Sequence, residues 1–150
     1  MRSLILCLGI LMSASSYAQL TLENALVRAM PPGQPNTAAF MIMINSGNTD
    51  IRLTAVKSSI SKKSEFHQHK KSKQGVMSMS RVEFIDIKAG GSFTFKSGGH
   101  HIMMMGLKRM LKPGESVQLQ LFDDNGQDYA FELPVVSIIQ AQEMKHAHHH

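Results

Sequence analysis

Short apolar or alternating stretches recur along most of the chain, separated by turn-forming residues. The two clearest are residues 38–45 (AAFMIMIN) and 116–122 (SVQLQLF), and both have the length of a β-strand. Shorter stretches of the same kind are residues 26–27, 53–56, 82–87, 92–95, 101–105 and 129–136. Because many short strands at close spacing are typical of antiparallel β-proteins, the pattern predicts an all-β sandwich or barrel.

Glycine, proline and asparagine fill the segments between these stretches, as in PPGQPN (31–36) and NSGNTD (45–50). Asn125-Gly126 lies between two alternating stretches and is the strongest hairpin signal, since both central positions of a tight primed turn need positive φ. The pattern predicts no long helix; residues 141–146 form a weak candidate for a short one.

The first eighteen residues differ from the rest. Arg2 precedes an apolar run, LILCLGILM (4–12), and small residues follow at Ser16 and Ala18. This order is typical of a secretory signal peptide cleaved after Ala18, and the run is shorter than the roughly 20 residues of a transmembrane helix. Cys7 lies inside the apolar run, so we expect no lipid anchor there. Removal of this segment leaves an exported chain without cysteine.

Composition narrows the function classes further. A chain of 150 residues fits one domain with a real core. The net charge of +5 comes without tryptophan and with only two tyrosines, which does not favour nucleic-acid binding. A single cysteine excludes an internal disulfide or a thiolate metal cluster. The chain is instead unusual in its 12 methionines and 8 histidines.

In three places, two histidines, two methionines or one of each are separated by a single residue, which is the period of a β-strand. His67 and His69 are two residues apart, as are Met77 and Met79, and the segment GGHHIMMM places His101 two residues before Met103. Successive strand residues face opposite sides, so each such pair shares one face. If these strands lie side by side, two imidazoles and two thioethers can meet.

Such ligands would select a soft metal. Thioether sulfur is soft and imidazole is borderline, so the set suits Cu(I) far better than Zn, Mg or Ca. The alternative is that methionine fills the core, as we expect for Met41, Met43 and Met110 in apolar surroundings. Spacing alone leaves these two interpretations open.

The motif His67-x₁₁-Met79-x₂₁-His101-x-Met103 resembles the signature of the PCu(A)C family of periplasmic copper chaperones. The resemblance covers roughly residues 21–136 and is most specific in residues 98–126. It implies a cupredoxin-like Greek-key β-sandwich, with one Cu(I) bound by His67, Met79, His101 and Met103. It also implies delivery of copper to the CuA centre of cytochrome c oxidase subunit II, alone or with a Sco-type thioredoxin-like protein.

The C-terminus is the other histidine-rich segment. A flexible tail over residues 139–150 follows the expected domain, residues 19–138. The tail offers a second site, for Cu(II), from Met144, His146, His148, His149 and His150. Lys62 and Lys63 on one side, and Lys70, Lys71 and Lys73 on the other, flank His67; as a hypothesis, they steer docking onto an acidic partner.

The sequence is compatible with two other functions. His67, His69 and His101 could form a catalytic zinc site with an open water position, although we expect no enzyme because the sequence carries no nucleophile or phosphate-binding motif. A plain exported sandwich domain that binds a partner protein is the other alternative. Beside the four expected ligands, His69 and His100 are expected to be solvated or to support the ligands.

Overall fold

The computed structural model describes residues 19–139. The expected signal peptide, Cys7, the weak helix at 141–146 and the tail histidines lie outside the described residues. The described part forms ten strands: β1 (Leu20–Arg28), β2 (Asn36–Asn45), β3 (Ile51–Ser58), β4 (Ser61–Lys71), β5 (Met77–Arg81), β6 (Ile85–Ile87), β7 (Ser92–Phe95), β8 (His100–Leu107), β9 (Ser116–Asp123) and β10 (Asp128–Val136). Between residues 19 and 139 we find no helix with the length and apolar character needed to cross a membrane.

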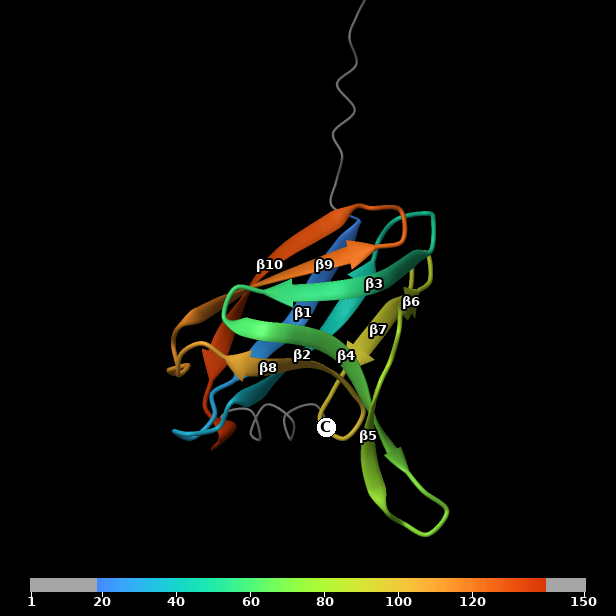
Figure 1. Ribbon diagram of the computed structural model, residues 1–150. Coiled ribbons are helices and arrows are strands. Elements are labelled where there is room, and N and C mark those ends of the chain that lie inside the picture. Colours follow the sequence, from blue (N-terminus) through green and yellow to red (C-terminus); the bar gives the residue numbers. More distant parts are fainter. Residues whose placement is uncertain (1–18, 140–150) are drawn as a thin grey trace, which may run out of the picture.

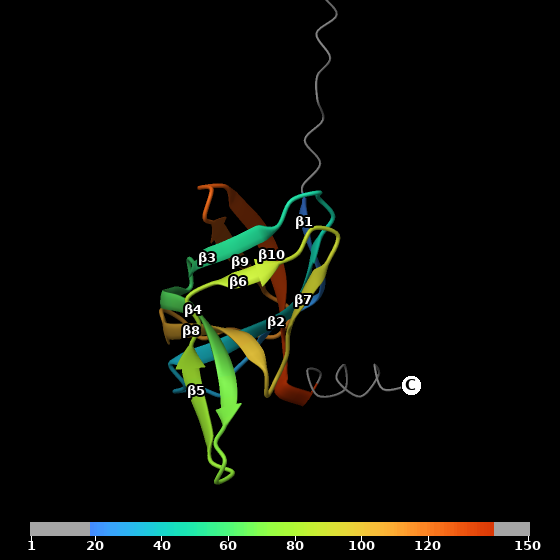
Figure 2. The same cartoon turned by 90° about the vertical axis from the view of Figure 1, so that its right-hand side faces the viewer.

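The strands form two layers that share one hydrogen-bonded path, β5-β4-β8-β2-β1-β10-β9-β3-β6, with β7 paired to β2 (Figure 1). The pairings are antiparallel except that of β1 with β10, which run parallel where the two layers join. The predicted all-β sandwich is therefore confirmed. The β4–β5 hairpin extends beyond the body of the sandwich in both side views (Figures 1 and 2).

Alternation along the strands builds the core. In β2, Ala39, Met41 and Met43 are buried against the opposite layer, as expected for methionines that fill space between sheets. Leu119 and Leu121 of β9 supply the same kind of buried row from the other layer. Met110 was expected in the core as well, and this was wrong: it lies in the loop after β8 and is 53% exposed.

Strand β4 was not among the strands expected from apolar pattern. Its residues are mostly polar, and only Ser61 and Phe66 are buried. Because the outer face of β4 carries charged and imidazole side chains, the strand lacks the apolar alternation that marks a half-buried strand. The expected strand at 82–87 is also shorter, since pairing with β3 begins at Ile85.

The β9–β10 hairpin forms where Asn125-Gly126 predicted it, but with a different turn. Only Gly126 has positive φ, at 82°, so this is not the tight primed turn. The Asp123 carboxylate accepts hydrogen bonds from the backbone N–H groups of Asn125 (2.9 Å) and Gln127 (2.8 Å). Because the side chain of Asp123 caps the loop, a longer turn with a single left-handed glycine suffices.

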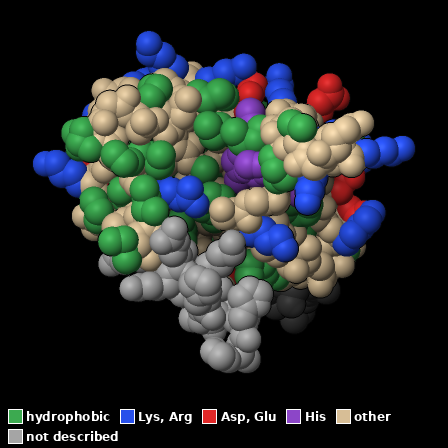
Figure 3. All heavy atoms as spheres, turned by 90° about the horizontal axis from the view of Figure 1, so that it is seen from below, with side chains coloured by type: hydrophobic (Ala, Val, Ile, Leu, Met, Phe, Trp, Pro, Cys, Tyr) green, Lys and Arg blue, Asp and Glu red, His purple; other side chains and the backbone are tan. Residues whose placement is uncertain are grey.

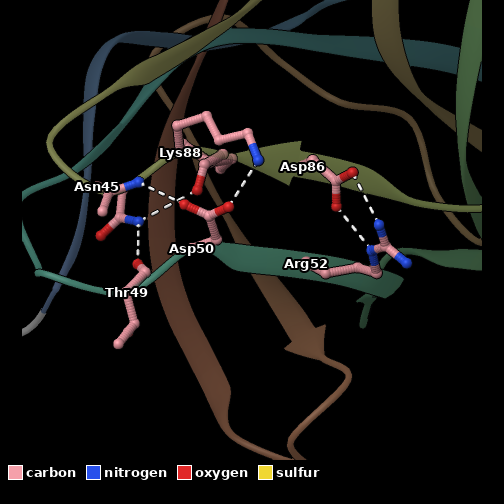
Figure 4. A network of polar contacts seen from close by, with 8 residues as sticks. Asn45, Thr49, Asp50, Arg52, Asp86 and Lys88 are labelled. Carbon is pink, nitrogen blue, oxygen red and sulfur yellow. Dashed lines mark hydrogen bonds and ion pairs between the residues drawn. The ribbon is translucent and has the colours of Figure 1, made fainter.

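A polar network ties the end of β2 to β3 and β6 (Figure 4). Asn45 is fully buried; its Nδ2 donates to the carbonyl oxygens of Thr49 (2.8 Å) and Ile87 (3.2 Å). Beside it, Arg52 forms two bonds with the carboxylate of Asp86, at 2.7 and 2.9 Å. These contacts hold this end of the sandwich closed, at the opposite end of β2 from the strand segment that pairs with β8.

Candidate metal centre

The outer face of β5, β4 and β8 gathers the residues singled out by the sequence. These strands are neighbours in the sheet, in the order β5-β4-β8. Their core-facing side chains include Phe66 and Ile102, which are buried. Seen from below, histidine side chains lie together among hydrophobic and basic side chains (Figure 3). The site thus lies on the face of the sheet that points away from the core.

His67 and His101 are brought together by strand register. They are direct cross-strand partners in the β4–β8 pair, and their ring centroids are 5.9 Å apart. His101 is only 3% exposed although it lies on the outer face, because the rings of Phe40, His67 and His69 surround it. Two of the four expected ligands are therefore adjacent and shielded from water.

Glu65 orients His67. Its carboxylate lies 2.9 Å from His67 Nε2, so this ring nitrogen carries the proton and donates it. That bond, together with the nearby Lys63 and Arg81, lowers the pKa of Glu65, which stays ionised. The other ring nitrogen, His67 Nδ1, is buried without a hydrogen-bond partner. A buried imidazole nitrogen with a free lone pair is a metal-ligand donor prepared in advance.

In His101 the other ring nitrogen, Nδ1, carries the proton. Its Nδ1 lies 3.2 Å from the carbonyl oxygen of Gly99, so Nδ1 donates and Nε2 keeps the lone pair. Burial lowers the pKa of His101, which keeps the ring neutral and able to bind a metal. The preceding Gly98 has φ of 79°, a conformation that needs glycine, and this turn directs the Gly99 carbonyl toward the ring.

Met103 lies on the same face as His101, two residues further along β8. It is half-buried, and its cross-strand partners are Glu65 on β4 and Ala38 on β2. Ala38 presents only a methyl group beside Met103 on the β2 side. The alternation expected for His101 and Met103 is thus present, with Ile102 and Met104 buried on the other face.

Met79 occupies a different part of the face. Its direct partner on β4 is His69, and the partner of His67 on β5 is Arg81. Four residues along β4 and two strand spacings separate Met79 from Met103, so an ideal flat sheet would place their Cα atoms ~16 Å apart. A site that includes both thioethers therefore needs the hairpin to bend toward β8.

Sequence reasoning placed His69 outside the ligand set, yet its ring is the nearest imidazole to His101, at 5.0 Å between centroids. His100 is different: it faces the other side of β8 and contacts the ring of Phe93 edge-on at 5.1 Å. Glu65 was also missed. Its position two residues before His67 on one strand was the signal that could have identified it.

Within residues 19–139, no three His, Cys, Asp or Glu side chains are arranged to hold a metal ion. The imidazoles of this face therefore do not form a ready three-nitrogen centre by themselves. Methionine sulfur is the remaining donor type present here, at Met79 and Met103. Neutral imidazole combined with thioether is a soft, uncharged donor set, which suits Cu(I).

Comparison with known proteins gives relatives by sequence and by fold. A family model described as "Putative lipoprotein LpqE-like" matches residues 20–135. The chain is 30% identical over 122 residues to "Putative lipoprotein Lxx21020" of Leifsonia xyli subsp. xyli, a match that covers 81% of this chain and 72% of that protein.

Solved structures with the same fold include a copper-bound PCuAC domain from PmoF2, with a TM-score of 0.66 and 20% identity over 80% of this chain and 94% of that one. A second is the solution structure of CuI-DR1885 from Deinococcus radiodurans, with a TM-score of 0.64 and 29% identity over 85% of each chain. The resemblance and the cupredoxin-like sandwich predicted from the sequence are confirmed.

Proposed function

Because the chain belongs to the LpqE-like family and has the fold of PCuAC domains, we propose that it is a Cu(I)-binding metallochaperone of the periplasm. In this proposal residues 19–138 are the copper-binding domain, which acts by binding and handing over copper, without catalysis. The copper ion is the cargo of the protein.

One observation carries the proposal: the buried Nδ1 of His67 has no hydrogen-bond partner, beside a buried, neutral His101. An unpaired buried polar atom costs roughly 1–3 kcal/mol, and metal coordination would satisfy it. His67 would bind copper through Nδ1 and His101 through Nε2, since the partner nitrogens are already used.

The two methionines complete the ligand set. Met103 lies on the face beside His101, and Met79 would join when the β4–β5 hairpin bends over the metal. Since thioethers carry no charge and do not form disulfides, they can hold Cu(I) in an oxidising compartment and release it again.

We propose the CuA centre of cytochrome c oxidase subunit II as the recipient, directly or with a Sco-type thioredoxin-like protein. Lys70, Lys71 and Lys73 are exposed on the hairpin that carries Met79. These charges would steer an acidic partner surface toward the ligands, so transfer should slow as ionic strength rises. The steering idea would be wrong if the transfer rate did not change with salt.

The same proposal assigns residues 1–18 to a cleaved signal peptide and residues 139–150 to a tail that captures Cu(II). The relatives are described as lipoproteins. For this chain we propose export without lipid attachment at Cys7, because that residue lies within the apolar run.

A Cu(I) titration against a competing chelator tests the proposal. To remove the contribution of the tail, its four histidines are changed to Gln. We expect one equivalent of tightly bound Cu(I), and weaker binding in Met79→Leu and Met103→Leu. Met110→Leu is the matched control, since Met110 at 53% is about as exposed as Met79 at 50% but lies in the loop after β8. If the protein were a zinc-dependent enzyme, the substitutions of Met79 and Met103 would leave its metal binding unchanged. A plain interaction domain would bind neither copper nor zinc.

A further inference from the structure

His69 occupies the part of the face that the four expected ligands leave empty. It is half-buried, on the same side of β4 as His67, and it lies between Met79 on β5 and His101 on β8. Its backbone N–H donates to the carbonyl oxygen of Gly99 at 3.2 Å. The same oxygen accepts the Nδ1 proton of His101, so one backbone atom fixes both histidines relative to each other.

Two groups of donors therefore share His101. The inner group consists of His67, His101 and Met103, which are buried or half-buried. The outer group consists of His69, His101 and Met79, and there the thioether is 50% exposed. The three imidazoles are not arranged around one point. A single ion would thus use one pair of imidazoles at a time, with Met103 beside the inner pair and Met79 beside the outer pair.

We propose that His69 is a copper ligand, and that with His101 and Met79 it forms an outer Cu(I) position from which copper leaves or enters. This inference rests on the proposed function. Transfer between the positions is a ligand exchange: the bonds from copper to His67 and Met103 break, and a bond to His69 forms. The bonds to His101 and to Met79, once the hairpin has bent over the metal, are kept, copper stays Cu(I), and no proton moves.

The outer position is more exposed than the inner one, so copper would leave the protein from the outer position. An acceptor protein can reach the outer position, because Met79 lies on the protruding hairpin (Figure 1). It cannot reach the inner one as easily, since the His67 side chain is only 15% exposed and Met103 is half-buried. His69 would therefore govern the rate of handover more than the equilibrium affinity.

Nitrogen NMR of the histidine rings tests the proposal directly. The probe is one equivalent of Cu(I), which is diamagnetic, added to the full chain with its tail histidines changed to Gln. We expect ring nitrogen shifts at His67, His69 and His101 and none at His100. Met103→Leu should increase the shift at His69, and Met79→Leu should abolish it.

Release kinetics give a second readout. His69→Gln should slow the transfer of Cu(I) to an excess of chelator by ~10-fold, on the scale of losses seen around metal ligands. The control His100→Gln should release copper at the wild-type rate, because His100 faces the other side of β8.

The proposal is overturned if His67 and His101 respond to copper while His69 is silent in the wild type and in Met103→Leu. It is also overturned if His69→Gln and His100→Gln release copper equally fast. In both cases the proposed function would stand. If no ring nitrogen responds to Cu(I), the proposed function itself fails.

Discussion

Replacing Glu65 tests how the protein prepares His67 for copper. The carboxylate is 2.9 Å from His67 Nε2, and its side chain is only 10% exposed. In Glu65→Ala the ring loses the anchor that holds its Nδ1 on the metal side. Loss of a carboxylate behind a metal-binding histidine typically weakens metal binding 10–100-fold. We therefore expect the Cu(I) affinity to fall by ~1.4–2.7 kcal/mol.

Glu65→Gln separates orientation from charge. The amide oxygen can still accept the Nε2 proton, so the ring stays in place while the negative charge that makes the imidazole more basic is lost. We expect a loss at the lower end of that range, roughly tenfold. Lys63 and Arg81 lose their ion pair with Glu65, but both are 63% exposed, so the cost to stability is small.

The assay is competition for Cu(I) against a chelator of known affinity, with thermal unfolding to check that each variant is folded. Glu83→Ala is the matched control, because it removes the same charge from an exposed position nearby. The reasoning is refuted if Glu65→Ala binds copper within about twofold of Glu83→Ala. It is equally refuted if copper shifts Nε2 of His67 in the wild type in place of Nδ1.

Three further predictions concern the rest of the chain. Asn45→Ala removes the hydrogen-bond donor to the carbonyl groups of Thr49 and of the buried Ile87, and should lower the free energy of unfolding by about 1–3 kcal/mol in a denaturant titration. Burial, with the Asp123 carboxylate beside it, raises the pKa of Tyr129 to about 12, above the unfolded value near 10; the folded state therefore keeps the proton longer, and stability should decline from pH 10 to 12. Tyr129→Phe should flatten that decline in thermal unfolding. The exported protein should have the mass of a chain that begins at Gln19 without lipid, whereas a lipid-bearing mass would contradict cleavage after Ala18.

The strands that bury apolar rows could be predicted from the sequence, because alternation in β2 and β9 records which face is buried. Strand β4 could not be predicted in this way, because its outer face carries glutamate and histidine and its sequence shows no regular alternation of apolar and polar residues. The sequence predicted the position of the turn at Asn125-Gly126 correctly, but it predicted the wrong turn type. Capping by Asp123 depends on a side-chain contact that turn propensities do not contain.

For the candidate site, the sequence by itself determined the donor types and which of them share a strand face: His67 with His69, and His101 with Met103. A period of two residues settles that question locally. Only the tertiary structure decided that His67 faces His101, that Met79 faces His69, and which nitrogen of each ring stays free. Register between strands far apart in sequence is set by turns and by the packing of the whole sheet. A register shift of two residues leaves each side chain on the same face of the sheet but gives it a different cross-strand partner.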